Sequence, residues 1–377
     1  MTRPAVNIAE LRERARQRLP RLVFEYLDGG AEDELSLQAN RQGFEDWRLQ
    51  PRLLRDVSQR SQAVSWWERE LPSPMAVAPI GLAGVFWPKA DIAVAQAAAA
   101  AGLPYILSTA SNSSIEDVAD QAGGDLWFQL YVINRSIADG LVRRALAAGY
   151  RTLVLTIDVA VGGKRERDLF NGFTQPFRLT PRVLWDMARR PHWLSQNWRG
   201  APQLANLVTL EAPDAESQAA LVQRRMDASY DWEALQRLRE MWPHRLVVKG
   251  ILHADDARRA FELGCDGVVL SNHGGRQLDG AVSALDLLPQ VAKLANRGLV
   301  LVDGGVRRGS DILKARALGA DGVLLGRAAQ FGVASGGREG AARALAILRD
   351  ELDRTMALSG VASLERIPDD LLRRANC

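Results

Sequence analysis

The sequence contains few cysteines, few histidines and no long uninterrupted hydrophobic run. Its 377 residues include only two cysteines, Cys265 and Cys377, so a disulfide framework is excluded and a reducing cytosolic setting is expected. The longest apolar stretch, residues 92–107, is interrupted by a glutamine, a glycine and a proline. It therefore predicts a helix followed by a strand, and a membrane span is not expected.

Neither the N-terminal segment nor the charge balance of the sequence points to a special destination or partner. No apolar segment precedes the charged run at residues 10–18, so no secretory signal is expected. The 48 basic residues are nearly matched by 45 acidic residues, which gives no support for a nucleic-acid partner. With 47% hydrophobic and 25% charged residues, the composition is that of a globular protein.

Short β-branched runs alternate with alanine-rich helical stretches along the chain. Strands are predicted at residues 75–78, 105–107, 126–130, 152–158, 246–249, 267–271, 299–303 and 322–326. Helices are predicted at residues 90–101, 114–122, 136–148, 231–241, 254–263, 284–296 and 310–318. Near-identical phrases at 263–267 and 318–322 precede two of the strands. The pattern predicts an α/β fold, a (β/α)₈ TIM barrel that forms a single domain over residues 1–377.

Two segments fall outside the regular alternation. Residues 1–70 precede the first strand and are interpreted as an N-terminal helical extension and cap. The stretch 159–230, after the fourth strand, exceeds an ordinary barrel connection and is interpreted as an insertion.

Every predicted strand ends in, or leads directly into, hydrogen-bonding or glycine positions. Because chemistry in TIM barrels takes place at the carboxyl ends of the strands, these residues are candidates for one site. They are Pro79, Gly81, Ser108, Gln129, Tyr131, Thr156, Asp158, Lys249, Ser271, His273, Asp303, Gly326 and Arg327. The alternative for any single position is that a strand end is polar because it meets water.

The loop Ser-Asn-His-Gly-Gly-Arg-Gln, residues 271–277, directly follows a buried apolar strand. His273 can accept a proton near neutral pH, and Arg276 can hold a carboxylate through two hydrogen bonds. A base beside a carboxylate clamp suits chemistry at the carbon next to an acid group. For His273 taken alone, the alternative is a structural role, in which the side chain caps or packs against its neighbours.

Two glycine-arginine loops follow the last two strands. Residues 303–310 read Asp-Gly-Gly-Val-Arg-Arg-Gly-Ser, and Gly326-Arg327 follows the eighth strand. Backbone N–H groups in these loops form the usual phosphate site of the fold. Gly-Gly pairs also mark ordinary turns, but two such loops on adjacent strands predict a phosphorylated cofactor or substrate.

These motifs, with Tyr26 in Tyr-Leu-Asp-Gly-Gly-Ala-Glu-Asp-Glu and with Gln129-Leu130-Tyr131, resemble the FMN-dependent 2-hydroxy acid dehydrogenases and oxidases. The resemblance extends from about residue 8 to residue 372. Residues 156–169 and 226–235 are most similar to the (S)-mandelate dehydrogenases of that family. The resemblance implies FMN as the cofactor and oxidation of an (S)-2-hydroxy acid, (S)-mandelate above others, to the 2-oxo acid.

The resemblance also implies a role for each residue. His273 would be the base and Asp158 its partner, with Tyr131 and Lys249 also catalytic. Substrate binding would involve Tyr26, Tyr131, Arg165, His273 and Arg276. FMN binding would involve Pro79, Gly81, Ser108, Gln129, Thr156, Lys249, Ser271, Asp303, Gly305, Arg307, Gly326 and Arg327. No metal site is implied, and Lys164 and Arg167 lie close enough to Arg165 to compete for the clamp position.

Part of the insertion, residues 177–210, combines Trp185, Trp193 and Trp198 with five arginines and a single acidic residue. Tryptophan and arginine suit a lipid headgroup region, and the resemblance implies a membrane-binding segment. We therefore expect peripheral attachment to the cytoplasmic side of the inner membrane and a quinone as electron acceptor. The alternatives for the segment are an active-site lid or a subunit contact.

Three functions stay open at this level. They are a quinone-linked dehydrogenase, an oxidase that produces hydrogen peroxide, and an idle barrel that binds a phosphorylated ligand. L-Lactate remains an alternative substrate, and the resemblance implies a homo-oligomer, a tetramer in its relatives.

Overall fold

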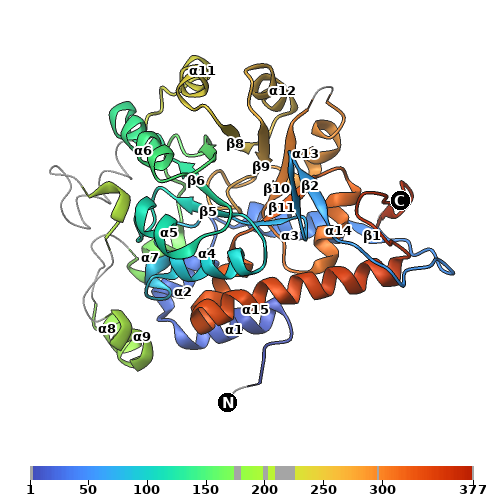
Figure 1. The fold of residues 1–377 in the computed structure, drawn as a ribbon. Helices are drawn as coiled ribbons and strands as arrows, with labels where there is room; N and C mark the ends of the chain where they lie inside the picture. Colours follow the sequence, from blue (N-terminus) through green and yellow to red (C-terminus); the bar gives the residue numbers. More distant parts are fainter. Residues whose placement is uncertain (1–2, 174–179, 198–202, 209–225, 295–296, 376–377) are drawn as a thin grey trace.

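Eight parallel strands close into a barrel at the centre of the protein (Figure 1). The computed structural model describes residues 3–173, 180–197, 203–208, 226–294 and 297–375. The strand order around the barrel is β10-β11-β4-β5-β6-β7-β8-β9. The strands are β4 (Met75–Val77), β5 (Tyr105–Ser108), β6 (Leu126–Leu130), β7 (Thr152–Thr156), β8 (Arg245–Ile251), β9 (Gly267–Leu270), β10 (Leu299–Asp303) and β11 (Gly322–Leu325). The predicted (β/α)₈ barrel is confirmed.

Helices cover the outside of the barrel between these strands. They are α4 (Ala90–Ala100), α5 (Ile115–Ala122), α6 (Arg135–Ala147), α11 (Trp232–Met241), α12 (Ala254–Glu262), α13 (Ala284–Val291) and α14 (Gly309–Ala317). The predicted helix at 284–296 is too long, because α13 ends at Val291; its last two predicted residues, 295–296, lie outside the described residues. Gly102, Gly149, Gly264 and Gly319 have positive φ just beyond four of these helices, as their positions in the sequence predict.

The two near-identical phrases before β9 and β11 play the same structural part. Asp266 Oδ2 accepts a hydrogen bond from the Leu246 N–H at 2.8 Å, and Asp321 Oδ2 accepts one from the Val300 N–H at 2.8 Å. Each carboxylate thus ties the start of one strand to the start of its neighbour. They are equivalent units of the barrel.

The fourth predicted strand, 152–158, is two residues too long. β7 ends at Thr156, and Asp158 packs over Gly250, where an added Cβ would lie 2.7 Å from the Asp158 Cβ. Gly250 has a φ of +104° and interrupts the register between β8 and β9. This irregularity leaves room for Asp158 beside the carboxyl end of β8.

In its described part, from residue 3, the extension contains three helices, a single strand and a hairpin that ends one residue beyond it. The helices are α1 (Ile8–Arg18), α2 (Arg21–Asp28) and α3 (Leu35–Glu45), the single strand is β1 (Trp47–Leu49), and the hairpin consists of β2 (Val64–Trp66) and β3 (Arg69–Leu71). β1 pairs with β12 (Leu372–Arg374) near the C-terminus, and β2 pairs with β3. Trp66 lies against Gly322, where an added Cβ would meet its ring at 2.2 Å, so the hairpin closes the amino-terminal end of the barrel.

A long helix after the last strand is absent from the prediction. α15 (Arg327–Ser359) runs beside α1 across the base of the view in Figure 1. The backbone leaves helical geometry at Gly336 and Gly337. These glycines interrupt the helical sequence pattern, while burial against α1 and α4 stabilises the helix in the fold.

The described parts of the insertion form small helices. They are α7 (Glu166–Asn171), α8 (Pro181–Ala188), α9 (Pro191–Asn197) and the 3₁₀ turn η2 (Ala205–Leu207). α8 and α9 lie outside the ring of barrel helices in Figure 1. A second 3₁₀ turn, η1 (Ala83–Val85), follows β4. No helix among the described residues is long and apolar enough to cross a membrane.

Candidate active site

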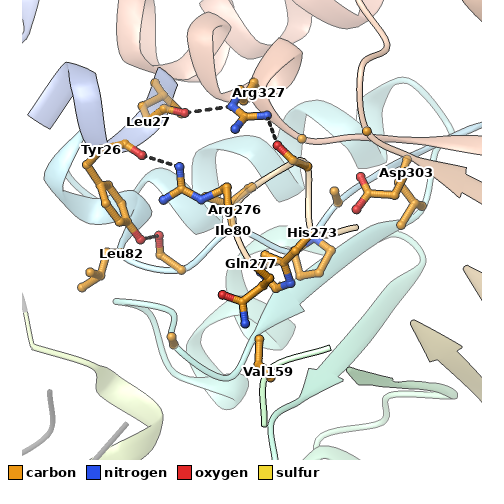
Figure 2. A pocket seen from close by; sticks show the side chains of 18 of the residues that line it. Tyr26, Leu27, Ile80, Leu82, Val159, His273, Arg276, Gln277, Asp303 and Arg327 are labelled. Atoms are coloured by element: carbon orange, nitrogen blue, oxygen red, sulfur yellow. Dashed lines mark hydrogen bonds between the residues drawn. The ribbon is translucent and has the colours of Figure 1, made fainter. Parts of the chain in front are cut away.

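A cavity of about 250 Å³ opens at the carboxyl ends of the barrel strands. Its lining includes many of the predicted site residues: Tyr26, Pro79, Gly81, Tyr131, Arg165, Lys249, His273, Arg276, Asp303, Gly305, Arg307, Gly326 and Arg327. The other predicted residues, Ser108, Gln129, Thr156, Asp158 and Ser271, lie behind this lining. Figure 2 shows His273 and Arg276 on one loop, with Asp303 and Arg327 on neighbouring elements.

His273 lies between a carboxylate and a phenol. Its Nδ1 is 2.8 Å from Asp158 Oδ1, and its Nε2 is 3.2 Å from the Tyr131 hydroxyl. Burial opposes ionisation of Asp158, but the charge and hydrogen bond of His273 outweigh it and lower the pKa of Asp158. An ionised Asp158 fixes the proton on Nδ1 and leaves Nε2 as the basic nitrogen.

The loop geometry of His273 depends on its neighbours. His273 has a φ of 59°, in the left-handed region, and its N–H donates to Ser271 Oγ at 3.0 Å. The two glycines that follow also have positive φ. The chain therefore turns sharply at the strand end and presents the imidazole to the cavity.

Beside the histidine, Lys249, Ser271 and Asp303 form a buried network. Lys249 Nζ is 2.8 Å from Asp303 Oδ2, and Ser271 Oγ lies 2.9 Å from the ammonium and 2.8 Å from the carboxylate. Burial disfavours both charges, yet the pKa of Lys249 is raised and that of Asp303 lowered because each faces the other. The site thus holds a fixed ammonium group at the end of β8.

Two arginines reach the side of the cavity occupied by Tyr26. The Arg276 guanidinium donates to the carbonyls of Tyr26 and Gly29 at 2.7 and 2.8 Å, and its centre lies 4.9 Å from the Tyr26 ring. The Arg165 guanidinium lies 5.8 Å from the same ring. Burial, and then the charge of Arg165, lower the pKa of Arg276, because the two cations converge.

The neighbours of Arg165 do not compete for this position. Lys164 pairs with Glu166, and Arg167 binds Glu25 and Glu34 away from the cavity. Arg165 alone of the three lines the cavity, although its Nε also donates to Asp168 at 2.8 Å.

The glycine-arginine loops after β10 and β11 form the opposite end of the cavity. Gly305 has a φ of 82°, and an added Cβ there would lie 2.1 Å from the Asn40 carbonyl oxygen, so only glycine fits. Burial lowers the pKa of Arg307 to about 10, with a further contribution from Arg41. No carboxylate is ion-paired with Arg307 in the part of the chain that the structure describes. An anionic ligand would supply the missing charge.

Arg327, predicted to contact the cofactor, lines the cavity and also holds backbone groups of two other segments. Its guanidinium donates to the carbonyls of Leu27, Gly274 and Gly29 at 3.2, 2.9 and 2.9 Å. It therefore ties α2 to the histidine loop (Figure 2). Burial, then the charges of Arg276 and Arg307, lower its pKa to about 9, so a nearby anion would also stabilise this group.

Several buried polar atoms in the site have no hydrogen-bond partner among the residues that the structure describes. They are Gln129 Nε2, Thr156 Oγ1 and Asp158 Oδ2, whereas Gln129 Oε1 accepts from Ser108 Oγ at 3.1 Å. Buried polar atoms are almost always satisfied in proteins, so these atoms indicate a ligand with polar groups. A donor, an acceptor hydroxyl, an ammonium group and an anion site together suit a polar ring that carries a phosphate.

The apolar wall of the cavity is missing from the prediction. It consists of Ile80, Leu82, Phe86, Phe173, Leu204 and Met226. Phe173 stacks on Tyr26 with ring centroids 4.2 Å apart and an interplanar angle of 9°. Because Phe173, Leu204 and Met226 belong to the insertion, local sequence patterns do not place them at the site. The length of the insertion was the only available signal.

The insertion is anchored to the body beside the cavity. The Trp193 indole donates to the Val85 carbonyl at 2.7 Å and is 5% exposed, so its expected position at a lipid surface is wrong. A buried indole N–H needs an acceptor, and the strand-end turn provides one. Trp185, in contrast, is 68% exposed and lies near the exposed Leu184. Arg178, Trp198 and Arg199 lie outside the described residues.

The family match places this barrel and its site among the flavin-dependent oxidoreductases. The sequence matches the FMN-dependent dehydrogenase family over residues 15–374, and the chain belongs to this family, with FMN as its cofactor.

Individual relatives match over almost the whole chain. It is 50% identical to the (S)-mandelate dehydrogenase of Pseudomonas putida, over 99% of this chain and 95% of that protein. It is 38% identical to an L-lactate dehydrogenase of Pseudomonas syringae pv. syringae, over 98% of each. Among solved structures, monotopic membrane (S)-mandelate dehydrogenase has a TM-score of 0.96 at 49% identity, over 99% of this chain and 100% of that one.

Proposed function

We propose that the protein oxidises (S)-mandelate to phenylglyoxylate and passes the electrons to a membrane quinone. The observation that carries this proposal is the placement of base and clamp in one cavity. His273, paired with Asp158, lines the same cavity as Arg165 and Arg276. A 2-hydroxy acid needs both features, because its carboxylate must be held while a proton leaves the neighbouring centre.

Each residue of the pair and clamp has a distinct role in this proposal. Arg276 and Arg165 hold the substrate carboxylate, and the hydroxyl groups of Tyr26 and Tyr131 hydrogen-bond its oxygens. His273 Nε2 accepts the proton, from the hydroxyl if hydrogen leaves the carbon as hydride, or from the α carbon if a carbanion forms. Asp158 stabilises the resulting imidazolium, as ionised partners of catalytic histidines do.

FMN, when bound, accepts the two electrons that the substrate carbon loses. Arg307, with the backbone of Gly305 and Gly326, would hold its phosphate, and Asp303 would contact the ribityl chain. Lys249 would stabilise negative charge on the reduced ring. The remaining contacts would come from Pro79, Gly81, Ser108, Gln129, Thr156, Ser271 and Arg327. The unpaired Gln129 Nε2 and Thr156 Oγ1 support this assignment.

An aromatic substrate suits the apolar wall. Phe86, Phe173 and Met226 provide contact area that the methyl group of lactate would leave largely unfilled. The test is anaerobic mixing of the holoenzyme with (S)-mandelate, L-lactate and (R)-mandelate while the flavin absorbance is followed. (S)-Mandelate should bleach the flavin fastest, and the (R)-enantiomer serves as the matched control. Faster bleaching by lactate would assign the protein as a lactate dehydrogenase instead.

The proposal of a membrane quinone as electron acceptor rests on the insertion, which would attach the protein to the membrane. Its exposed Leu184 and Trp185, with the basic residues of 177–210, suit the surface of an anionic membrane, and we propose peripheral attachment on the cytoplasmic side of the inner membrane. Deleting 177–210 should reduce the fraction of protein that pellets with membranes.

Steady hydrogen peroxide formation in air-saturated buffer would indicate an oxidase instead. A homotetramer is proposed as well, and light scattering after size-exclusion chromatography tests it.

A further inference from the structure

Gln277, at the end of the histidine loop, directs its side-chain hydrogen bonds to the loop that follows β7. Its side chain is 9% exposed and lines the cavity (Figure 2). The amide nitrogen donates to the carbonyls of Asp158 at 2.9 Å and Val161 at 3.1 Å. The amide oxygen accepts from the Gly163 N–H at 2.8 Å. Both donor hydrogens and one acceptor site of the amide are therefore used on one neighbouring loop.

The loop held by Gln277 carries two groups of the site. Asp158 is at its start and Arg165 follows its end. Between them, Val161 is 76% exposed, so little packing holds this segment in place. Two other backbone bonds flank it, from Ile157 N–H to the Lys249 carbonyl and from Glu32 N–H to the Lys164 carbonyl.

Backbone contact reinforces the connection. An added Cβ at Gly163 would lie 2.3 Å from the Arg276 carbonyl oxygen and 2.7 Å from the Gln277 Cα. The two loops thus touch where glycine permits it, and the glutamine amide spans the rest of the gap.

The Asp158 carboxylate depends on this backbone anchor. Its Oδ1 meets His273, but its Oδ2 has no hydrogen-bond partner within the described structure. A carboxylate held by a single side-chain hydrogen bond is oriented mainly by where its backbone is fixed. The Gln277 amide fixes that backbone at the Asp158 carbonyl.

We infer that Gln277 is a positioning residue that holds two parts of the site in place. These parts are the His273–Asp158 pair and Arg165, one of the two arginines of the clamp. It acts through Asp158 and Arg165 rather than on the substrate. The inference rests on the proposed function, because it concerns the same base and clamp. It predicts that loss of the hydrogen bonds of the Gln277 amide disturbs proton transfer and carboxylate binding at the same time.

The test replaces Gln277 by methionine, which keeps the length of the side chain and removes all three hydrogen bonds. In the FMN-loaded Gln277→Met enzyme we expect kcat/KM to fall by roughly 10- to 100-fold, the cost of a displaced catalytic group. The acidic limb of the pH profile should move to lower pH, because a displaced carboxylate stabilises the protonated imidazole less. The dissociation constant of phenylacetate, followed by the flavin spectrum, should rise several-fold.

Two further variants make the test decisive. Gln96→Met is the matched control, because Gln96 also donates to a backbone carbonyl, at Gln121, but outside the cavity. Gly163→Ala should reproduce the Gln277→Met pattern by pushing the same loops apart. If FMN-loaded Gln277→Met keeps the wild-type pH profile and phenylacetate affinity, Gln277 has only a structural role and the inference is wrong. A wild-type holoenzyme that oxidises no 2-hydroxy acid would instead refute the proposed function.

Discussion

Replacing Asp158 by asparagine removes one charge from the site and keeps its shape. Asp158 Oδ1 lies 2.8 Å from His273 Nδ1, and an asparagine oxygen can accept the same hydrogen bond. The pKa of Asp158 is already below its ordinary value, so the native carboxylate is charged throughout an assay range above pH 5. Any change in Asp158→Asn therefore reports the loss of an ion pair in the protonated state of His273.

The expected size follows from the geometry. Two unit charges about 4 Å apart attract by about 4 kcal/mol at an effective dielectric constant of about 20. The side chains of His273 and Asp158 are 21% and 11% exposed, so solvent reduces this value somewhat. Since about 1.4 kcal/mol corresponds to a tenfold change in rate, we predict that kcat/KM falls roughly 100- to 1000-fold.

The assay is the pH dependence of anaerobic flavin reduction by (S)-mandelate. The rate should fall, and its acidic limb should move to lower pH, while FMN stays bound. Asp120→Asn, at an exposed position on α5, is the control. A variant that stays within threefold of the wild type at every pH would show that Asp158 does not act through its charge.

Three other predictions follow from the structure. Arg307→Met should weaken FMN binding roughly 10- to 100-fold in a fluorescence titration, because the FMN phosphate loses its buried cationic partner, whereas Arg338→Met on the surface should not. Burial raises the pKa of Asp91 to about 6, so its contribution to stability is present at low pH and is lost as pH rises toward 7. Between pH 4 and 7 the stability of Asp91→Asn should therefore rise relative to that of the wild type. The change in relative free energy of unfolding should reach up to about 3 kcal/mol and should appear as a rising difference in Tm. Tm curves that stay parallel over this range would contradict the prediction. Trp185→Ser should reduce flotation with anionic vesicles and leave the Tm unchanged, since that indole is exposed; unaltered flotation would remove Trp185 from the membrane contact.

The barrel fold and the chemistry of its loops could be predicted from local sequence. Each strand of the barrel is a short apolar run, and the glycines with positive φ mark helix ends and the turn around His273. These features depend on neighbours within a few residues. The long helix α15 is absent from the prediction because Gly336 and Gly337 break its local sequence pattern. The helix α1 against which it packs is also far away in the sequence.

The roles of single side chains within the site were less accessible. Arg327 has the sequence context of a phosphate ligand, but nothing in that context indicates that it also binds three carbonyl groups of two other segments. Trp193 has the composition of a lipid anchor around it, yet its indole is buried against Val85. In both cases the partner is a backbone carbonyl, which every residue has and which no sequence motif marks.

Local sequence patterns are enough to predict the eight-strand barrel, the glycine-rich loops and the kinds of groups at the strand ends. Which of these groups meet depends on the folded chain. Asp158 and His273 are 115 residues apart in the chain and come within 2.8 Å because barrel closure brings the ends of β7 and β9 together around β8. Likewise Phe173 reaches Tyr26 only through the folded insertion. Hydrophobic periodicity and backbone preference act over a few residues, whereas the contacts that shape the site depend on the packing of the complete chain.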